Sequence, residues 1–232
     1  MTDRPILFSA PMVRALLAGT KTQTRRVVKP QWSADAEPQE RCSVSIPEGW
    51  QVAGHSGLWE DAVSMEYVRR CPYGVPGDRL WVRESGVLLR HAYDHDPAIG
   101  MDLWQDAGWL FPDGEVRGAF ESDPPVSEWV DECSRIGRPS IHMPRWASRL
   151  TLKITAIRVE RLQDISADDA DAECFGGDFP EKVLPDLFPE RPDGWGHLSI
   201  PECYARLWES INGPGSWAAN PWVWAVSFKV VR

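Results

Sequence analysis

The hydrophobic and polar positions near the start of the chain predict a strand, a helix and a second strand. Residues 6–9 form a short apolar run that is typical of a strand. Val13, Leu16 and Leu17 recur at spacings of three and four, which predicts a helix, and Gly19 predicts its end. The segment "TRRVVKP" predicts a second strand that ends before Pro30. The polar cluster "GTKTQTRR" therefore joins a helix to a strand.

Further elements are predicted later in the chain. Residues 80–82 follow a Pro-Gly-Asp turn and have the composition of a buried strand. Leu150, Leu152 and Ile154 alternate with polar residues, which predicts a long half-buried strand within 148–165. Residues 166–176 predict a short acidic helix, residues 200–213 an amphipathic helix, and residues 221–231 a final strand.

Three segments between these elements have weak periodicity and much Pro, Gly and Asp: 31–72, 87–134 and 177–199. They are predicted to be loop-rich insertions. The expected fold is α+β, mostly strands with a few short helices, in a single domain over residues 1–232 that carries these insertions.

The composition agrees with one domain and indicates the cellular compartment in which we expect the protein. At 232 residues and 43% hydrophobic content, the chain has enough apolar material for a sizeable core. It has no apolar run of about 18 residues and no secretory type of N-terminus, so we expect a cytoplasmic protein without a membrane partner. Five scattered cysteines without a Cys-x-x-Cys pair favour reduced thiols.

The charge of the chain is unevenly distributed. The net charge is -9, yet residues 1–30 carry net +5 and residues 135–161 carry net +6. If the fold brings these two segments together, they form a positive patch that can bind phosphate groups. The alternative is that these cations lie on ordinary solvated faces, balanced by neighbouring acids.

The cluster after the first helix contains a candidate nucleophile. A lysine can activate a threonine hydroxyl if its own proton is lost, and Lys21 lies three residues before Thr24. The cations Arg25 and Arg26 favour that loss. Glu173, at the end of the acidic helix, is a candidate proton donor. The alternative is a polar surface turn and a solvated glutamate.

Other residues suit the binding of a nucleic acid. The segment "HMPRWASR" combines His142, Arg145, Trp146 and Arg149, a mixture that can stack a base and pair with phosphates, although Trp146 could instead be a core residue. Candidate binding residues elsewhere are Thr22, Arg25, Arg26 and Arg83. His91 and His95 could share a metal ion only in a helix, and no metal or cofactor is expected.

Four segments of the chain together resemble ASCH-domain proteins of the longer form found in bacteriophages and prophages. These are "ILFSAPMVRALLAGTKTQTRR", "YGVPGDRLWVRES", "VERLQDIS" followed by "ADAE", and "PWVWAVSFKVV". They cover about half of the chain. ASCH domains belong to the PUA-like superfamily, small β-barrels that bind RNA or modified bases, so the resemblance implies a mostly antiparallel barrel.

One branch of that family, the N4-acetylcytidine amidohydrolases, implies roles for three residues. By this resemblance Lys21 is the proton acceptor, Thr24 the nucleophile and Glu173 the proton donor in hydrolysis of an acylated or otherwise modified pyrimidine nucleoside. The partner is then a modified nucleoside or a single-stranded nucleic acid. The alternatives are a non-catalytic module that binds RNA, DNA or a modified base, a single-stranded RNA nuclease, and a phage assembly protein. The present chain is much longer than the minimal amidohydrolases.

Overall fold

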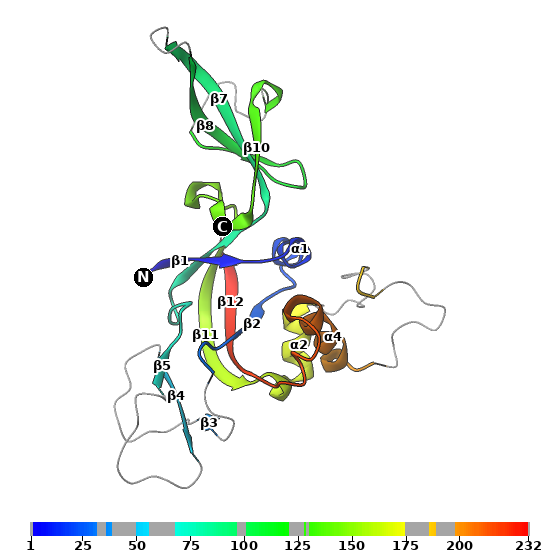
Figure 1. Cartoon of the computed structure of the whole chain (residues 1–232). Helices are drawn as coiled ribbons and strands as arrows, with labels where there is room; N and C mark the ends of the chain where they lie inside the picture. Colours follow the sequence, from blue (N-terminus) through cyan, green and yellow to red (C-terminus); the bar gives the residue numbers. More distant parts are fainter. Residues whose placement is uncertain are drawn as a thin grey trace. The chain divides into compact units, whose positions relative to one another are not determined.

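The computed structural model has a mixed α+β fold with three α-helices and mostly antiparallel strands in its described residues (Figure 1). These residues are 2–31, 36–38, 50–55, 68–96, 101–120, 128, 130–174, 186–188 and 198–231. The chain divides into two compact units, each described here by itself. The first holds Met1–Arg4, Pro11–Leu80 and Leu152–Val231, and the second holds Pro5–Ala10 and Trp81–Thr151.

The largest sheet has five strands in the order β1-β6-β11-β12-β2. Their bounds are β1 (Asp3–Leu7), β2 (Gln23–Val27), β6 (Arg79–Arg83), β11 (Thr151–Arg161) and β12 (Trp222–Val231). Strand β12 is buried on both faces over Trp222–Val226 and pairs with β11 and β2 at its two edges. Strand β2 pairs antiparallel with β12 and lies at the edge of this sheet.

The three α-helices confirm the predicted helical segments. Helix α1 (Ala10–Ala18) is followed by Gly19 at φ +78°, a left-handed conformation that glycine adopts without steric cost. Helix α2 (Ala167–Cys174) is the predicted acidic helix, and the Ser166 hydroxyl accepts from the Asp169 backbone N–H at 3.1 Å. Helix α4 (Ile200–Asn212) begins with a capping box formed by Ser199 and Glu202.

The first unit also contains a small sheet of three antiparallel strands, β3 (Ala36–Pro38), β4 (Trp50–His55) and β5 (Val68–Arg70). It lies within the predicted insertion 31–72, and the rest of that insertion up to residue 67 is outside the described residues. Most of the predicted insertion 177–199 is also outside them. A single 3-10 turn, η6 (Leu162–Asp164), follows β11.

The second unit contains a four-stranded antiparallel sheet in the order β10-β7-β8-β9. The strands are β7 (Gly86–Asp96), β8 (Met101–Leu110), β9 (Val116–Gly118) and β10 (Ser134–Arg138). The prediction that 87–134 is irregular is therefore wrong for 87–96, 101–110 and 116–118, and residues 97–100, 121–127 and 129 lie outside the described residues. The register shifts between Leu89 and Arg90 and between Ala92 and Asp94. Such bulges interrupt the alternation by which a strand is recognised.

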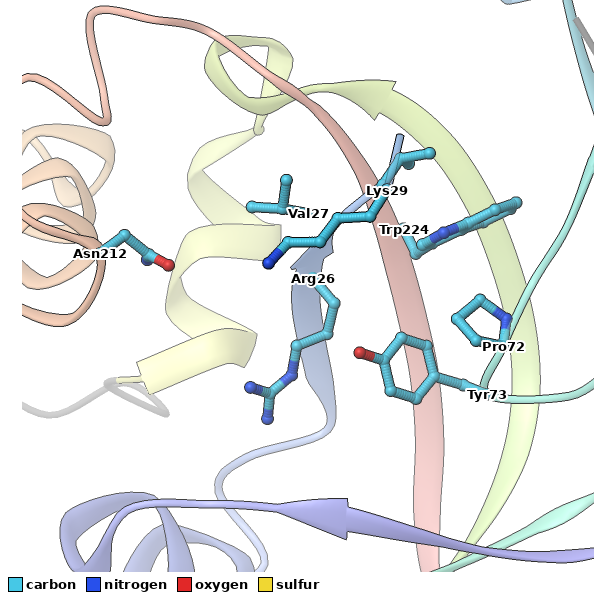
Figure 2. Close-up of a pocket in the computed structure, with 8 residues that line it drawn as sticks. Arg26, Val27, Lys29, Pro72, Tyr73, Asn212 and Trp224 are labelled. Carbon is cyan, nitrogen blue, oxygen red and sulfur yellow. The ribbon is translucent and has the colours of Figure 1, made fainter. Parts of the chain in front are cut away.

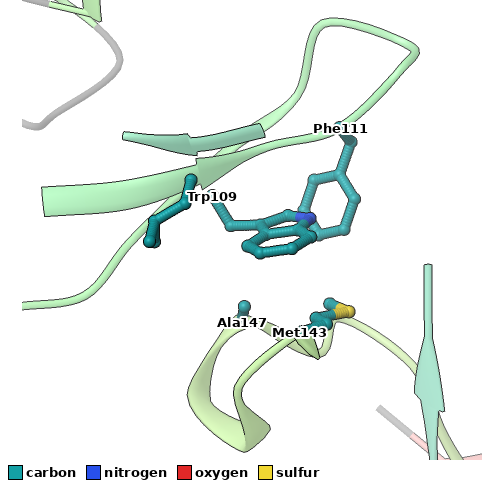
Figure 3. Close-up of a cluster of buried hydrophobic side chains, with 5 residues drawn as sticks. Trp109, Phe111, Met143 and Ala147 are labelled. Atoms are coloured by element: carbon teal, nitrogen blue, oxygen red, sulfur yellow. The ribbon is translucent and has the colours of Figure 1, made fainter. Parts of the chain in front are cut away.

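A cluster of buried side chains forms the core of the second unit (Figure 3). Trp109 and Phe111, from β8 and the turn after it, face Met143 and Ala147. The latter two lie at the short 3-10 turns η4 (Ser140–His142) and η5 (Arg145–Ala147), and a third turn, η3 (Val130–Glu132), precedes β10. Trp109 is fully buried, so the cluster holds the hairpin against the segment around 140–147.

Two coarse predictions can be compared with this architecture. Within the described residues every sheet is open and none closes into a barrel, so the barrel implied by the resemblance is not found. No helix in this part of the chain combines the length and apolar character needed to cross a membrane. The prediction of one domain with three insertions stays a prediction.

Candidate functional site

Lys21 and Glu173, predicted to act together from a separation of 152 residues, are in contact. The Lys21 ammonium donates to the backbone carbonyl of Glu173 and, at 3.2 Å, to its Oε2. A backbone hydrogen bond next to each residue joins their segments, because Thr22 N–H donates to the carbonyl of Ala172 at 2.9 Å. The carbonyl of Thr22 in turn accepts from Phe228 N–H of β12, also at 2.9 Å. Lys21 and Glu173 are 2% and 4% exposed, so this ion pair is buried.

Arg25 extends this pair into a larger cluster. Its guanidinium donates to Glu173 Oε1 at 3.2 Å, to Asp169 Oδ2 at 3.0 Å and to Glu160 Oε1 at 2.7 Å. It also donates to Gln23 Oε1 at 2.7 Å. The Arg25 side chain is 0% exposed, so its donors serve the protein itself.

We use the name buried ion network, after its buried members Lys21, Arg25 and Glu173, for these three groups together with the partly exposed Arg158, Glu160 and Asp169. Three cations face three carboxylates, so the network is electrically balanced. Balance is needed because an uncompensated buried charge is strongly destabilising.

The pKa values in the network reflect these contacts. Burial alone lowers the pKa of Arg25, but the charges of Glu173 and Glu160 outweigh burial and raise it. Burial raises the pKa of Asp169, but the hydrogen bond from Gln23 and the charges of Arg158 and Arg25 bring it below its ordinary value.

The carboxylate of Glu173 has a third neighbour in helix α4. The Tyr204 hydroxyl donates to Glu173 Oε1 at 3.4 Å, beside the contact from Arg25. Lys21, Arg25 and Tyr204 thus fix the orientation of this side chain from three directions. A proton donor at this position would have to leave at least one of these contacts to reach a substrate.

Thr24, the predicted nucleophile, lies on the other face of β2. Neighbouring residues of a strand point to opposite faces, and Gln23 and Arg25 both bond with Asp169 of α2. Thr24 is therefore directed away from α2, on the same face as Arg26. It pairs with Val226 of β12 and is 4% exposed. The structure brings Lys21 and Glu173 together and separates Thr24 from them by the strand.

A pocket of about 470 Å³ opens at the end of β2, in the first unit (Figure 2). Its lining residues are Arg26, Val27, Val28, Lys29, Pro72, Tyr73, Asn212 and Trp224. Figure 2 shows Asn212 on one side, Pro72, Tyr73 and Trp224 on the other, and the β2 residues between them. We call this the β2 pocket. It combines two cations, two aromatic rings and one amide.

Tyr73 and Arg26 influence each other in this pocket. Burial raises the pKa of Tyr73, and the positive charge of Arg26 opposes that rise. Trp224 is 2% exposed and lies directly across from Arg26 in the β12–β2 register. The pocket therefore holds a positive charge next to aromatic surface, an arrangement that suits an anionic aromatic ligand.

In the second unit, Arg149 is bound by acids of its own chain. Its guanidinium pairs with Glu84, Asp113 and Glu115, each within 2.8 Å, and lies over the ring of Phe111. These hydrogen bonds outweigh burial and raise the pKa of Arg149, and Arg149 in turn lowers the pKa of Asp113. The predicted role of Arg149 in binding phosphate therefore competes with three carboxylates.

The other predicted binding residues of the second unit have different surroundings. Arg83 and Arg145 lie over the ring of Trp81, at 4.6 and 5.8 Å from its centroid. Trp146 packs against the core cluster of Figure 3, which favours the alternative that it is a core residue. His142 is exposed at the end of η4.

The metal site considered for His91 and His95 required a helix. Both residues lie in strand β7, where residues four apart are separated by about 13 Å. The helical conformation on which that site depended is therefore absent. In the described part of the chain, no group of three or more His, Cys, Asp and Glu side chains is arranged to hold a metal ion.

Sequence reasoning missed most of the β2 pocket and half of the ion network. The missed polar and aromatic residues of the pocket are Lys29, Tyr73, Asn212 and Trp224, and the missed network residues are Arg158, Glu160 and Asp169. Lys29 and Arg158 had a signal, because they belong to the two basic segments, and Tyr73 and Trp224 lie in segments that carry the resemblance. Comparisons with protein-family models, with curated proteins and with solved structures give no match to this chain.

Proposed function

We propose that the protein is a PUA-like protein of the ASCH type that binds a nucleotide, free or within a single strand, in the β2 pocket. The observation that carries this proposal is the composition of the pocket, in which Arg26 and Lys29 lie with Tyr73 and Trp224. A phosphate group takes the two cations and a base takes the partly exposed ring of Tyr73, behind which Trp224 is buried.

The size of the pocket supports a single nucleotide unit. Ligand sites of small molecules are clefts of about 300–1,000 Å³, and the β2 pocket has about 470 Å³. That volume accommodates one base with its sugar and phosphate. A longer single strand would place one nucleotide here and continue over the surface.

The position of the pocket also supports the PUA-like assignment. The motif "GTKTQTRR" ends in Arg26, so the segment most specific to the resemblance leads directly into the pocket. The strand "PWVWAVSFKVV", which closes the resemblance, contributes Trp224. The segment "YGVPGDRLWVRES" contributes its first residue, Tyr73. Three of the four resembling segments thus contribute to one site.

The proposal is tested by the salt dependence of binding to a short fluorescein-labelled oligouridylate, followed by fluorescence anisotropy. If Arg26 and Lys29 each contact a phosphate, the slope of log K against log salt is about -1.4, and about -0.7 after removal of either cation. The variants are Arg26→Gln and Lys29→Gln. Matched controls are Arg14→Gln on α1 and Lys153→Gln on β11, both exposed and outside the pocket.

Two outcomes would count against nucleotide binding at this pocket. The first is no binding of the oligonucleotide at about 50 mM salt. The second is an equal loss of affinity in the pocket variants and in the two controls, because that would indicate a diffuse charge effect. Competition by cytidine 5′-monophosphate distinguishes a site for one nucleotide from one that needs a strand.

A second candidate function is the hydrolysis of an acyl amide on a modified pyrimidine nucleoside, and the contact between Lys21 and Glu173 favours it. In this mechanism a proton first passes from the Lys21 ammonium to the Glu173 carboxylate, and the neutral Lys21 amine then accepts the proton of Thr24, whose Oγ1 attacks the acyl carbonyl. Glu173 then protonates the departing exocyclic amine, and water releases the acyl group from Thr24. For this step the Lys21 amine and the Thr24 hydroxyl, which strand β2 separates, would have to approach each other past the edge of that strand.

This candidate is tested by incubating the protein with N4-acetylcytidine and measuring cytidine and acetate by chromatography. Production of cytidine that is lost in Thr24→Ala and in Glu173→Gln supports it. The absence of cytidine removes hydrolysis of this substrate, and undiminished production by Thr24→Ala removes the role of Thr24. Binding measured with the same samples shows whether the pocket is intact in each variant.

A further inference from the structure

Two arginines of the second unit lie on one tryptophan ring. The guanidinium carbons of Arg83 and Arg145 are 4.6 and 5.8 Å from the centroid of the Trp81 ring. The two positive charges are therefore within roughly one Debye length of each other, which is about 10 Å at 0.1 M salt. A ring attracts a guanidinium through its charge and leaves its N–H groups able to donate to a phosphate.

Strand β10 brings a third arginine to the same part of this unit. Arg138, the last residue of β10, pairs with Gly86 of β7, and Ile136 pairs with Leu88. Residues two apart in a strand share a face, so Arg138 lies on the face that carries Leu88. Leu88 belongs to the core cluster with Met143, the residue that follows η4. Arg138 therefore shares the face of the sheet on which the segment with η4 and η5 packs.

The segment that follows the start of β10 is basic. Residues 133–149 contain four arginines, one histidine and no aspartate or glutamate. Arg149 is held by three acids from other segments, and Arg135 pairs with one acid of η3. Arg138 and Arg145 are both exposed. The exposed part of this segment therefore presents positive charge, which suits an anionic partner.

An exposed imidazole and an exposed apolar side chain lie between these arginines in the sequence. His142 ends η4 and is exposed, and the neighbouring Ile141 is 53% exposed. Side chains of this kind can contact unpaired bases, whereas the bases of a duplex are stacked on one another. We define the η4–η5 patch as these five residues of the second unit: Arg83, Arg138, Ile141, His142 and Arg145.

We propose that the η4–η5 patch binds the backbone of a single-stranded nucleic acid, as a second site in addition to the β2 pocket. Each of the three arginines takes one phosphate, and the bases lie against His142 and Ile141. This goes beyond the proposed function, because the patch needs no ligand in the β2 pocket.

The test uses the full chain with the pocket cations removed by Arg26→Gln and Lys29→Gln. A fluorescein-labelled oligouridylate of about 20 nucleotides is titrated by fluorescence anisotropy at pH 8, from about 50 mM salt upward. We expect a slope of log K against log salt of about -2.1, for three arginine–phosphate contacts. A further Arg138→Gln or Arg145→Gln should weaken binding and bring the slope to about -1.4.

The matched control is Arg135→Gln in the same background. Arg135 is also exposed and also in β10, but it is three positions from Arg138, which places it on the opposite face of the strand. It pairs with Asp131 at 2.5 Å. The control should therefore keep both the affinity and the slope.

The outcomes separate this inference from the proposed function. The patch is rejected if the protein without pocket cations no longer binds the longer oligonucleotide, or if Arg135→Gln lowers the slope as much as Arg138→Gln and Arg145→Gln. Equally tight binding of polyglutamate or of an RNA duplex rejects a single strand as its ligand. The proposed function fails instead if Arg26→Gln and Lys29→Gln leave binding of the short oligonucleotide unchanged, and that result does not affect the patch.

Discussion

Replacement of Arg25 by methionine removes the central cation of the buried ion network. Methionine keeps most of the volume of the stem and carries no charge, so the change is chiefly electrostatic. The guanidinium contacts Glu160, Asp169 and Glu173, and its side chain is fully buried. Without it, Lys21 and Arg158 face three carboxylates, and the network carries an uncompensated negative charge.

The size of the effect follows from burial. Removal of one partner from a buried ion pair costs about 3–5 kcal/mol, because the remaining charge is left without compensation. Glu173 is 4% exposed, so water cannot easily replace the lost partner. For a chain of 232 residues, this corresponds to a decrease in melting temperature of about 6–20 °C.

The assay is urea unfolding followed by far-UV circular dichroism, with Arg158→Met as the matched control. Arg158 contacts two of the same acids, Asp169 and Glu160, but its side chain is 46% exposed. Exposed pairs contribute up to about 1 kcal/mol, so the control is expected to lose no more than that. The double variant of Arg25→Met with Glu173→Gln should lose less than the sum of the two single changes, since both remove the same contact.

The reasoning is refuted if Arg25→Met and Arg158→Met lower the free energy of unfolding equally. Equal losses would indicate that the contacts of Arg25 are as well hydrated as those of Arg158. A small loss in both would mean that the network contributes little to stability and that its charges are already compensated by solvent.

Three further predictions concern acid stability, thiol reactivity and the second unit. Because the pKa of Asp169 is lowered on folding, its contribution to stability is present above its ordinary value of 3.8 and is lost as pH falls through the lowered value. Asp169→Asn should flatten this dependence in urea titrations between about pH 5 and 1, and an unchanged slope would contradict the assignment. Cys71 is 0% exposed, and burial raises the pKa of its thiol to about 11. Iodoacetamide near pH 8 should therefore not alkylate Cys71 in the native protein until denaturant is added, as measured by peptide mass spectrometry. Alkylation at the rate of a free thiol would show that the site opens. Glu84 and Asp113 both pair with Arg149, but Glu84 is buried and Asp113 is 49% exposed. Glu84→Gln should therefore lower the free energy of unfolding by about 2–4 kcal/mol, and Asp113→Asn by less than about 1 kcal/mol. A larger loss for Asp113→Asn than for Glu84→Gln would contradict this geometry.

The predictable part of the fold is the part in which local signals agree. Helix α1 could be located because its apolar spacing and the glycine after it indicate the same boundary, and Gly19 does adopt positive φ. Strand β12 could be located because a long apolar run without glycine or proline favours a buried strand. Both predictions depend only on residues that are close together in the sequence.

The hairpin β7–β8 could not be predicted by the same reasoning. Its two register shifts change which residues share a face, so the alternation is interrupted within a single strand. Aspartates in both strands resemble the composition of loops. Pairing with β9 and β10 supplies the hydrogen bonds of the sheet, and this pairing cannot be recognised from either segment alone.

The candidate site shows a similar division. The family resemblance suggested that Lys21 and Glu173 act together, and they are in contact. The acidic partners of Arg25 lie 135 to 148 residues away, so no local pattern indicated that this cation serves the fold. The separation of Thr24 from Arg25 follows from the alternation of β2, but the choice of face depends on the position of α2.

Strand β2 thus presents two kinds of chemistry on its two faces. Gln23 and Arg25 bind helix α2, whereas Arg26 on the other face lines the β2 pocket. Because adjacent residues share a backbone, the contacts that hold Arg25 also fix the backbone that carries Arg26. If the β2 pocket binds a nucleotide as proposed, Arg25 acts as a positioning residue for it. Loss of Arg25 should lower stability and ligand affinity together, whereas loss of Arg26 should lower affinity alone.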